Sequence, residues 1–501
     1  MRKLLLIFSI LMILSPQGYS EEVREDPQKK LPKMTLADCV MLAVKNNLDI
    51  RYGFLQRISD RFNLKVAEHK FTPFGVGATQ LSSQRISTNP QGIPRTTGSS
   101  QNAAFNTVVT IPTGGAFSFS WDNPANKADV QQVNQYSPGW SLSFVQPLLR
   151  GGGVEIATAS VMIARVSEEI SILNLKATAI NTIVAAIQQY RAFSQALSQL
   201  RIDQKALEQS KQTYETNKKL IDAGRMARTE LVQSDADISG KKLQIVEDKN
   251  NLESARLALI QVLNIDQNTF FEPVEEGDVK VTPPSFQEAM EIATNYSPVY
   301  LQTLQNVETA RLNYVLAKNN RLWNLSVGVG IGRSGIAGTR FGPAYDALAS
   351  VGKSDWNVGT TLSIPFNDLT YEQTYITNMV AYEQAKLTLK KAEITLSIAV
   401  QNAIRTVELQ FQQLELARQT RVFSEQKLDI ENKKLKAGQT SNFQLVSFQN
   451  DLVNARNAEL ANFINYLNAL TTLDQTLGTT LKTWRIEIKK DDKEIKAADK
   501  Q

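Results

Sequence analysis

Hydrophobic and polar residues alternate with a period of two in several short stretches of the chain. Leu325, Val327, Val329 and Ile331 alternate with serine and glycines, and the segments that begin at Trp140 and Trp356 repeat the pattern. This alternation predicts strands with one apolar face and one face of small polar residues. Further strand candidates cover residues 74–83, 105–111 and 116–121.

The predicted strands fit a membrane better than a soluble sheet, although a half-buried soluble sheet would alternate in the same way. Their lengths near ten residues and their aromatic ends favour membrane strands, and so does the signal peptide predicted over residues 1–20, which indicates export of the chain. Such strands must close into a barrel, because lipid offers no partner to backbone groups. One chain supplies roughly four to six strands, fewer than the about eight that a barrel needs, so several chains must contribute.

Apolar residues recur every seven positions in the rest of the chain. The repeat indicates long helices with a narrow apolar seam that faces a partner helix. In the first half, its members are Phe193, Leu200, Leu207, Tyr214 and Ile221, then Leu231, Ile238, Ile245, Leu252 and Leu259. In the second half, they are Val400, Val407, Leu414, Leu428 and Leu435, with Arg421 interrupting the series.

Each helical stretch contains one glycine that predicts a reversal of the chain. The segments "NKKLIDAGRMARTELVQ" and "NKKLKAGQTSNFQLVS" place Gly224 and Gly438 before a Leu-Val pair. A glycine just past a helix end adopts the left-handed conformation at little cost. We therefore expect Gly224 and Gly438 to lie in the turns at the tips of two antiparallel hairpins. The arm before Gly224, roughly 70 residues, would be about 105 Å long.

The chain is predicted to be an internal duplication. Residues 35–50 and 285–300 are both helix starts, with Thr or Ser as cap and an acidic residue three positions on. The first opening helix is expected to continue to near Lys70 and the second to near Asn320. The returning arm of each hairpin is shorter than its first arm, and we expect an opening helix to lie end to end with it and make up the missing length. Repeat 1 would cover 35–266 and repeat 2 would cover 285–481, joined by an equatorial linker at 267–284.

The two ends of the chain carry different signals. A basic start, an apolar run and small residues before position 20 predict a signal peptide over residues 1–20. No later stretch predicts a transmembrane helix. Residues 482–501 form a charged C-terminal tail.

The composition limits the chemistry that the chain can perform. Among 501 residues there are one cysteine, Cys39, and one histidine, His69. An internal disulfide is impossible, and we expect no metal site, no cofactor and no catalytic residue. Cys39 is interpreted as a small packing residue and His69 as a solvated residue near a helix C-terminus. The net charge of +5 is not gathered in a basic block, which argues against nucleic-acid binding.

These features together predict an internally duplicated α+β membrane protein. The order of "TLADCVMLAVKNN", "QPLLRGGG", the two glycine turns and "LNALTTLDQTLGTTL" resembles the TolC family of outer-membrane efflux proteins. The resemblance implies a homotrimer with a shared β-barrel in outer-membrane lipid, continued by a long antiparallel α-helical coiled-coil barrel in the periplasm. It also implies docking to a periplasmic adaptor protein and an inner-membrane pump, proton-driven or ATP-driven.

The resemblance further suggests residues for the constriction and gate at the tips. In the family, two aspartates ring the narrowest point, and counted forward from Gly438 they correspond to Gln444 and Ser447. A tyrosine and an arginine that help lock the closed tip correspond to Leu435 and Thr440. The first tip keeps Thr229 and an acidic Glu230. The nearest carboxylate on the second arm is Asp451, one turn beyond Ser447. An aspartate ring at that level is therefore absent.

The expected function is a passive exit duct of a tripartite efflux or type I secretion system, leading from the periplasm to the exterior. Drugs, metals, siderophores and polypeptides all leave by ducts of this kind. An alternative is a structural coiled-coil protein of the cell envelope, although such a protein would not need strands inserted at matching places in both halves. An exported enzyme has little support, because carboxylates such as Asp235 and Asp237 on a wet helix are usually only solvated.

Overall fold

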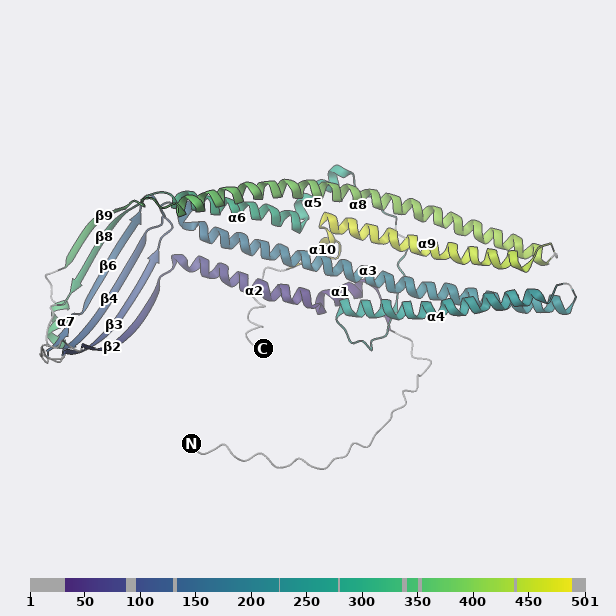
Figure 1. Ribbon diagram of the computed structural model, residues 1–501, viewed down its shortest axis with the longest axis horizontal. Helices are drawn as coiled ribbons and strands as arrows, with labels where there is room; N and C mark the ends of the chain where they lie inside the picture. Colours follow the sequence, from purple (N-terminus) through teal and green to yellow (C-terminus); the bar gives the residue numbers. More distant parts are fainter. Residues whose placement is uncertain are drawn as a thin grey trace, which may run out of the picture.

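The computed structural model describes residues 32–86, 96–128, 133–224, 226–277, 280–335, 340–349, 354–436 and 439–488. The predicted signal peptide and most of the predicted C-terminal tail lie outside these residues. The described chain is elongated, with one antiparallel sheet at one end and long helices that run away from it (Figure 1).

The sheet combines strands from both halves of the chain. The long strands pair in the order β2-β3-β4-β6-β8-β9, and the short β5 pairs with β4. The two halves meet where β6 pairs with β8, with Phe144 opposite Val329. The bounds of the strands are β2 Phe74–Ile86, β3 Thr96–Thr110, β4 Ala116–Ala128, β5 Val133–Tyr136, β6 Gly139–Pro147, β8 Asn324–Ser334 and β9 Asp355–Ser363.

The first half contributes more strand than the alternation predicted. β3 begins at Thr96, nine residues before the predicted start at Phe105, and β4 continues to Ala128. The added residues, 96–104 and 122–128, are small or polar, and none is a large apolar residue that would reveal a period-two pattern. Backbone pairing sustains them, since β2 and β3 are in register from Phe74–Val108 to Ile86–Thr96.

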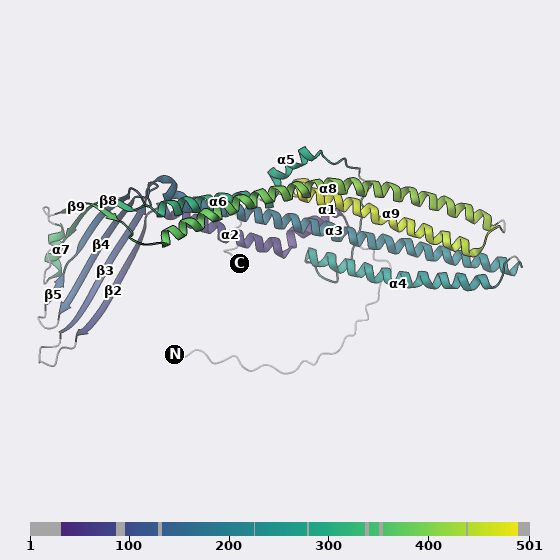
Figure 2. The same cartoon turned by 45° about the horizontal axis from the view of Figure 1, so that its top comes forward.

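Two long antiparallel hairpins form the helical part and extend to the same end of the molecule (Figures 1 and 2). Their arms are α3 Val154–Asp222 with α4 Thr229–Leu263, and α8 Thr370–Lys436 with α9 Asn442–Leu477. The remaining helices are α1 Leu36–Asn46, α2 Leu48–Glu68, the 3-10 turn η1 His69–Phe71, α5 Phe286–Tyr296, α6 Pro298–Asn320, α7 Phe341–Ala349 and α10 Thr480–Thr483.

The opening helices of the two halves begin as predicted but are each broken once. Thr35 with Asp38 and Ser285 with Glu288 form capping boxes, which confirms the predicted starts. The prediction of one unbroken helix in each half was wrong, because Asn47 and Ser297 are extended, with ψ of 132° and 113°. The Asn47 side chain caps α2. Pro298 disfavours helical geometry at the residue before it.

The short returning arms are continued by these opening helices. In Figure 1, α1 and α2 follow the end of α4 along α3, and α6 lies beside α8 beyond the end of α9. Side-chain amides bond across the first junction, from Asn47 to the carbonyl of Val262 and from Asn264 to that of Asn46. The linker contains β7 Glu272–Pro273, which pairs in parallel with β1 Lys33–Met34.

Tyr190 and Arg191 of α3 hold the linker in place. The Tyr190 hydroxyl donates to the carbonyl oxygens of Met34 and Val274, both at 2.8 Å. Arg191 forms a two-pronged ion pair with Glu276, at 2.8 and 3.0 Å, and donates to Thr471 of α9. α3 contains a stretch apolar enough to cross a membrane by composition, but 56% of that stretch is buried in the protein, as expected for a core helix.

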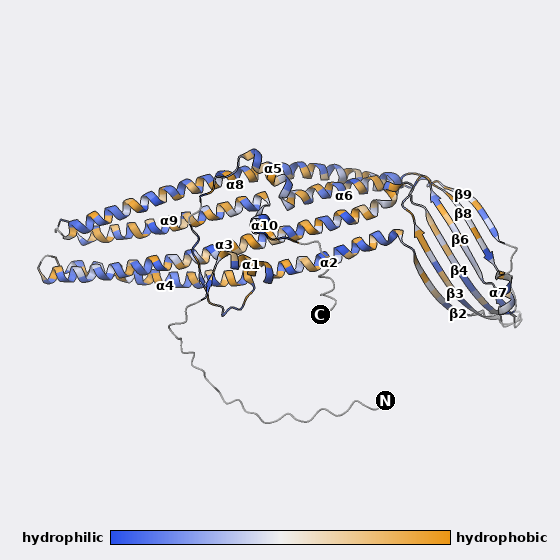
Figure 3. Cartoon of the chain, turned by 180° about the vertical axis from the view of Figure 1, so that it is seen from behind, coloured by the Kyte–Doolittle hydropathy of each residue, from blue (hydrophilic) through white to orange (hydrophobic). Residues whose placement is uncertain are grey.

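The predicted seams differ in how well they are buried. Apolar and polar residues alternate along all the long helices (Figure 3). The predicted seam of α8 is confirmed, since Val400, Val407, Leu414, Leu428 and Leu435 are all buried. The predicted seam of α3 is wrong beyond Leu200: Leu207, Tyr214 and Ile221 are half-buried, and Asp203, Ser210 and Asn217, also seven residues apart, are buried instead.

Cys39 and His69 lie where the sequence predicted. Cys39 has no exposed surface and packs in a cluster with Ala186, Tyr190 and Leu259. Burial raises the pKa of its thiol to about 12, which keeps it protonated and unreactive. His69 is exposed at the C-terminal end of α2.

Candidate functional site at the hairpin tips

The turn of the first hairpin depends on a glycine conformation. Gly224 has φ of +71°, and its N–H donates to the carbonyl of Ile221 at 2.9 Å. A Cβ atom added at Gly224 would meet nothing within 4 Å. A side chain at this position would therefore meet no steric clash. The constraint is the left-handed backbone conformation, which is unfavourable for residues with a side chain.

The turn of the second hairpin is described only on either side of its centre. Gly438 lies outside the described residues. After it, the N–H of Gln439 donates to the carbonyl of Lys434 at 3.0 Å. Ser441 then caps α9, because its hydroxyl accepts a hydrogen bond from the N–H of Gln444.

The two candidate residues of the first tip lie in the first turn of α4. Thr229 is exposed and Glu230 is half-buried. The carbonyl oxygen of Glu230 accepts hydrogen bonds from Ser234 and from Asn442 of the other hairpin. One carboxylate oxygen of Glu230 is buried and has no hydrogen-bond partner among the described residues.

Leu435 and Thr440 have different environments. Leu435 is buried with Leu428, Leu445 and Leu452 in a cluster that also contacts Met226. The Thr440 hydroxyl donates to the buried carboxylate of Glu431, back along α8. Leu435 thus contributes apolar packing, and Thr440 ties the turn to its own hairpin.

Gln444, Ser447 and Asp451 lie in the first three turns of α9. Gln444 and Ser447 are exposed, and Gln444 lines a cavity of about 550 Å³ together with Lys427 and Thr440. Asp451 forms an ion pair with Lys427 of α8 at 2.9 Å. The charge of Asp451 is therefore balanced within the hairpin, and the side chains of Gln444 and Ser447 are uncharged.

Three buried polar residues near the tips join the two hairpins, and the sequence analysis missed them. Asn217 of α3 donates to Ser234 of α4 at 3.1 Å and to the side-chain oxygen of Asn442 of α9 at 2.8 Å. Asn442 in turn donates to Ser234 at 3.1 Å. We call Asn217, Ser234 and Asn442 the tip cluster. Its one signal in the sequence was an asparagine, Asn217, next to the apolar seam of a coiled coil.

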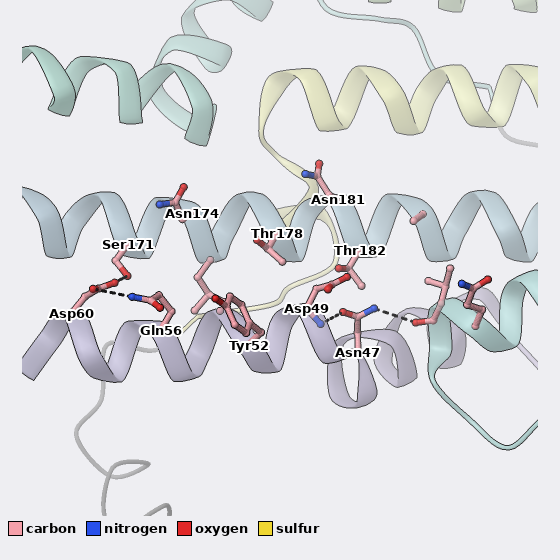
Figure 4. Close-up of a pocket in the computed structure, with 15 residues that line it drawn as sticks. Asn47, Asp49, Tyr52, Gln56, Asp60, Ser171, Asn174, Thr178, Asn181 and Thr182 are labelled. Atoms are coloured by element: carbon pink, nitrogen blue, oxygen red, sulfur yellow. Dashed lines mark hydrogen bonds between the residues drawn. The ribbon is translucent and has the colours of Figure 1, made fainter.

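A polar groove of about 840 Å³ lies between α2 and α3 (Figure 4). Within it, Asp60 of α2 accepts from Ser171 of α3 at 2.8 Å and from Gln56 at 3.2 Å. The groove contains neither cysteine nor histidine, and the hydrogen bond from Ser171 joins α3 to α2.

The described part of the chain contains no group of three or more His, Cys, Asp or Glu residues placed to hold a metal ion. The two tips offer exposed polar side chains, namely Thr229, Gln444 and Ser447, beside a buried, hydrogen-bonded junction. Such an arrangement suits contact with water, solutes or another protein.

Comparisons with known proteins identify the class to which this fold and these tips belong. The family model described as outer membrane efflux protein matches residues 113–264 and 293–479. The chain therefore belongs to the outer membrane efflux protein family, which confirms the resemblance inferred from the sequence. No curated protein sequence matches the chain.

Solved structures of low sequence identity share the fold. The CmeC outer membrane channel of Campylobacter jejuni has a TM-score of 0.66 at 16% identity, over 93% of this chain and 88% of that one. The open MtrE outer membrane channel of Neisseria gonorrhoeae has a TM-score of 0.65 at 15% identity, over 88% of each chain. The outer membrane protein VceC of Vibrio cholerae has a TM-score of 0.65 at 12% identity, over 88% of this chain and 96% of that one.

Proposed function

We propose that three copies of the chain close into a duct that leads passively from the periplasm to the exterior, within a tripartite efflux or type I secretion system. The sheet would form a third of a barrel in outer-membrane lipid, and the hairpins a third of a helical tunnel in the periplasm. The observation that carries the proposal is the pair of unpartnered edges on each chain.

The first edge is lined by β9 and by an exposed apolar face of α8. Among the described strands, β9 pairs with β8 alone. The α8 face consists of Leu387, Ile394, Ile398, Leu409, Leu416, Phe423 and Ile430. Most of its members are seven residues apart, which is the spacing that faces a partner helix. We call these residues the outer seam of α8.

The second edge lies on the opposite side of the molecule, where β2, α2 and α4 run (Figure 1). In the described part of the sheet, β2 pairs with β3 alone. The exposed apolar residues of this edge are Leu48, Tyr52, Leu55, Phe62 and Val66 on α2, and Val232, Leu243 and Val246 on α4. Two complementary edges on opposite sides favour a closed ring of identical chains. Exposed strand edges and apolar faces of this kind need partners.

The tips lie at the end of the hairpins away from the sheet, so they would open into the periplasm (Figure 1). We propose that they dock with a periplasmic adaptor protein and, through it, with a proton-driven or ATP-driven inner-membrane pump. In this arrangement, Thr229, Glu230, Gln444 and Ser447 surround the mouth, while Leu435, Thr440 and Asp451 hold the second tip.

The oligomer and the conduction can be tested with a pair of charge-matched variants. Leu416→Glu places a charge in the outer seam. Asn432→Glu places the same charge on an exposed site about 160° around α8. We expect the unmodified chain and Asn432→Glu to be trimers by native mass spectrometry after detergent extraction, and Leu416→Glu to dissociate. A monomeric unmodified chain with full strand content would contradict the proposal.

Conduction separates the duct from the alternative of a structural coiled-coil protein. The trimer should give stable single-channel currents in planar bilayers and should lower antibiotic accumulation in cells that also contain an adaptor and a pump. A trimer without currents would favour the structural protein.

A further inference from the structure

A cavity of about 710 Å³ lies near the middle of the molecule, where α9 ends and α6 begins. Its walls come from α3, from the junction of α5 and α6, and from the chain that follows α9 (Figure 1). We call the last of these walls, residues 480–488, the closing segment. The volume lies within the range of about 300–1,000 Å³ that is typical of sites for small organic molecules.

The backbone of the closing segment is fixed by its own hydrogen bonds. The N–H of Arg485 donates to the carbonyl of Lys482 at 3.1 Å, and the N–H of Ile486 donates to that of Leu481 at 2.8 Å. Arg485 thereby takes a left-handed conformation with φ of +53°. Glycine is the favoured residue at such a helix end. An arginine therefore occupies a position where glycine would fold more easily.

Part of the cavity lining is apolar. Ile180 of α3 is buried, and Leu481, Ile486 and Ile488 of the closing segment are half-buried. Pro298, the first residue of α6, also lines the cavity. Apolar surface of this kind gains free energy when the apolar part of a ligand covers it.

Three cationic side chains from two separate walls belong to the same lining. They are Lys176 of α3, and Lys482 and Arg485 of the closing segment. In the part of the chain that the structure describes, none of the three forms an ion pair. The Lys482 ammonium lies over the ring of Tyr296, 5.6 Å from its centroid.

The charges of the lining do not balance. Against the three cations stands one carboxylate, that of Glu487. Like charges that face one cavity repel each other, and an anion between them would turn this repulsion into attraction. The cavity therefore combines an excess of positive charge with an apolar surface.

We propose that this cavity binds a small organic anion with an apolar body, one ligand per chain. Lys176, Lys482 and Arg485 would hold the anionic group, while the apolar body covers Ile180 and Leu481. The lining residues belong neither to the tips nor to the two edges described above. The site therefore requires neither a ring of chains nor a docked partner.

A bound anion would join the two halves of the chain. It would contact α3 of the first half, and both the α5–α6 junction and the closing segment of the second. A ligand that binds only the intact site suppresses any local opening that destroys the site. At a ligand concentration 100 times the Kd, we expect hydrogen exchange of residues 481–488 to slow by a factor of about 100.

The binding experiment is a calorimetric titration of the full chain in phosphatidylcholine nanodiscs, with empty nanodiscs as the blank. The probe is naphthalene-1-sulfonate. One comparison ligand is naphthalene-1-sulfonamide, which has the same rings without the charge, and the other is inorganic sulfate, which has the charge without the rings. We expect saturable binding of the sulfonate at one site per chain, at least about tenfold tighter than either comparison ligand.

Each other outcome of the titration contradicts the proposal. Equal binding of sulfonate and sulfonamide would show that only apolar surface is recognised. Equal binding of sulfonate and sulfate would show an anion site without an apolar part. An absence of saturable sulfonate binding would overturn the site altogether.

Variants assign the binding to the cavity. Arg485→Gly removes the guanidinium and suits the left-handed backbone, so the closing segment should keep its fold. Lys176→Gln removes a charge from the opposite wall. Each variant should raise the Kd of the sulfonate at least about tenfold, because each loses a charged contact. Lys205→Gln, at an exposed lysine farther along α3, should leave the Kd unchanged. An unchanged Kd in both Arg485→Gly and Lys176→Gln would refute the assignment.

The titration and the test of conduction can fail separately. A chain that binds the sulfonate but carries no current would refute the duct and leave the anion site standing. A conducting chain that binds no sulfonate would refute the anion site and leave the duct standing.

Discussion

The two hairpins have the same antiparallel geometry, but different chemistry holds their arms together near the tips. Between α3 and α4, Asp203, Ser210 and Asn217 are buried, and Ser210 and Asn217 donate to Asp237 and Ser234. Between α8 and α9, a cluster of four buried leucines, namely Leu428, Leu435, Leu445 and Leu452, lies beside the buried Glu431. A leucine seam gains free energy from burial itself. A polar seam gains little and depends on every hydrogen bond being made.

The second hairpin places its charges at the edge of the leucine seam, where opposite signs meet. Arg421, which interrupts the apolar repeat, forms ion pairs with Glu425 on its own helix and with Glu459 on α9. Arg456 of α9 donates to Glu425 at 3.0 Å. This hydrogen bond from Arg456 is the largest cause that lowers the pKa of Glu425.

The ion pairs of the second hairpin respond to acid. A carboxyl group with a lowered pKa contributes stability above its unfolded pKa, about 4.3 for glutamate, and loses it as the pH falls through the folded value. Acid therefore weakens the ion pairs of the second hairpin. The polar seam of the first hairpin gains less free energy from burial, so we expect the first hairpin to be the more adjustable arm.

The largest expected effect comes from breaking the tip cluster, where the two hairpins meet. Asn442→Leu removes one of the two hydrogen-bond acceptors of the Asn217 amide and leaves one buried N–H unsatisfied, at a cost of about 1–3 kcal/mol. We expect hydrogen exchange at both tips to accelerate by a factor of about 10 or more. The exposed neighbour Phe443 provides a control, since Phe443→Leu should leave exchange unchanged. Equal exchange in Asn442→Leu and the unmodified chain would show that the cluster does not join the hairpins.

The next effect concerns the turn of the first hairpin alone. Gly224→Val forces a branched side chain into left-handed backbone, which costs about 1 kcal/mol or more. Efflux and adaptor docking should decrease, while the trimer should persist because the sheet lies about 100 Å away. Gly240→Ala is the matched control, because Gly240 lies inside helix α4 and alanine should stabilise it. Loss of the trimer in Gly224→Val would assign the glycine a different role.

The smallest effect concerns the response of the second hairpin to acid. Arg421→Met removes partly exposed ion pairs, and we expect a loss of about 0.2–1 kcal/mol near neutral pH. The variant should also lose part of the acid sensitivity of the second hairpin. The check is the distance between spin labels at Gln426→Cys and Asn454→Cys, followed from about pH 7 down to about pH 4. Equal acid sensitivity in the variant and the unmodified chain would show that Arg421 does not contribute to the acid response of the second hairpin.

Periodicity predicted much of this fold, because long repeats of two or seven residues leave a clear pattern. The seven-residue repeat predicted the buried face of α8. The helix starts at Thr35 and Ser285 were predicted from their cap residues and the acidic residue three positions on. Periodicity failed where polar residues replace apolar ones, as in the glycine- and serine-rich start of β3 and the buried face of α3 beyond Leu200. Burial of Asn217 depends on partners from other helices, and a single sequence does not reveal such partners. The tip cluster was missed for this reason.

The central claim is that the tips surround a conducting path, and the charge at its narrowest level tests this most directly. Gln444 and Ser447 are uncharged, and Asp451 is paired with Lys427. We therefore predict weak block of single-channel currents by trivalent metal complexes added on the periplasmic side. Gln444→Asp with Ser447→Asp would create a ring of six carboxylates in the trimer and should produce tight, voltage-dependent block. If the unmodified chain is strongly blocked and Asp451→Asn abolishes this block, the narrowest level lies one turn farther along α9, at Asp451. Strong block that survives Asp451→Asn, or no block of the double variant, would contradict the account.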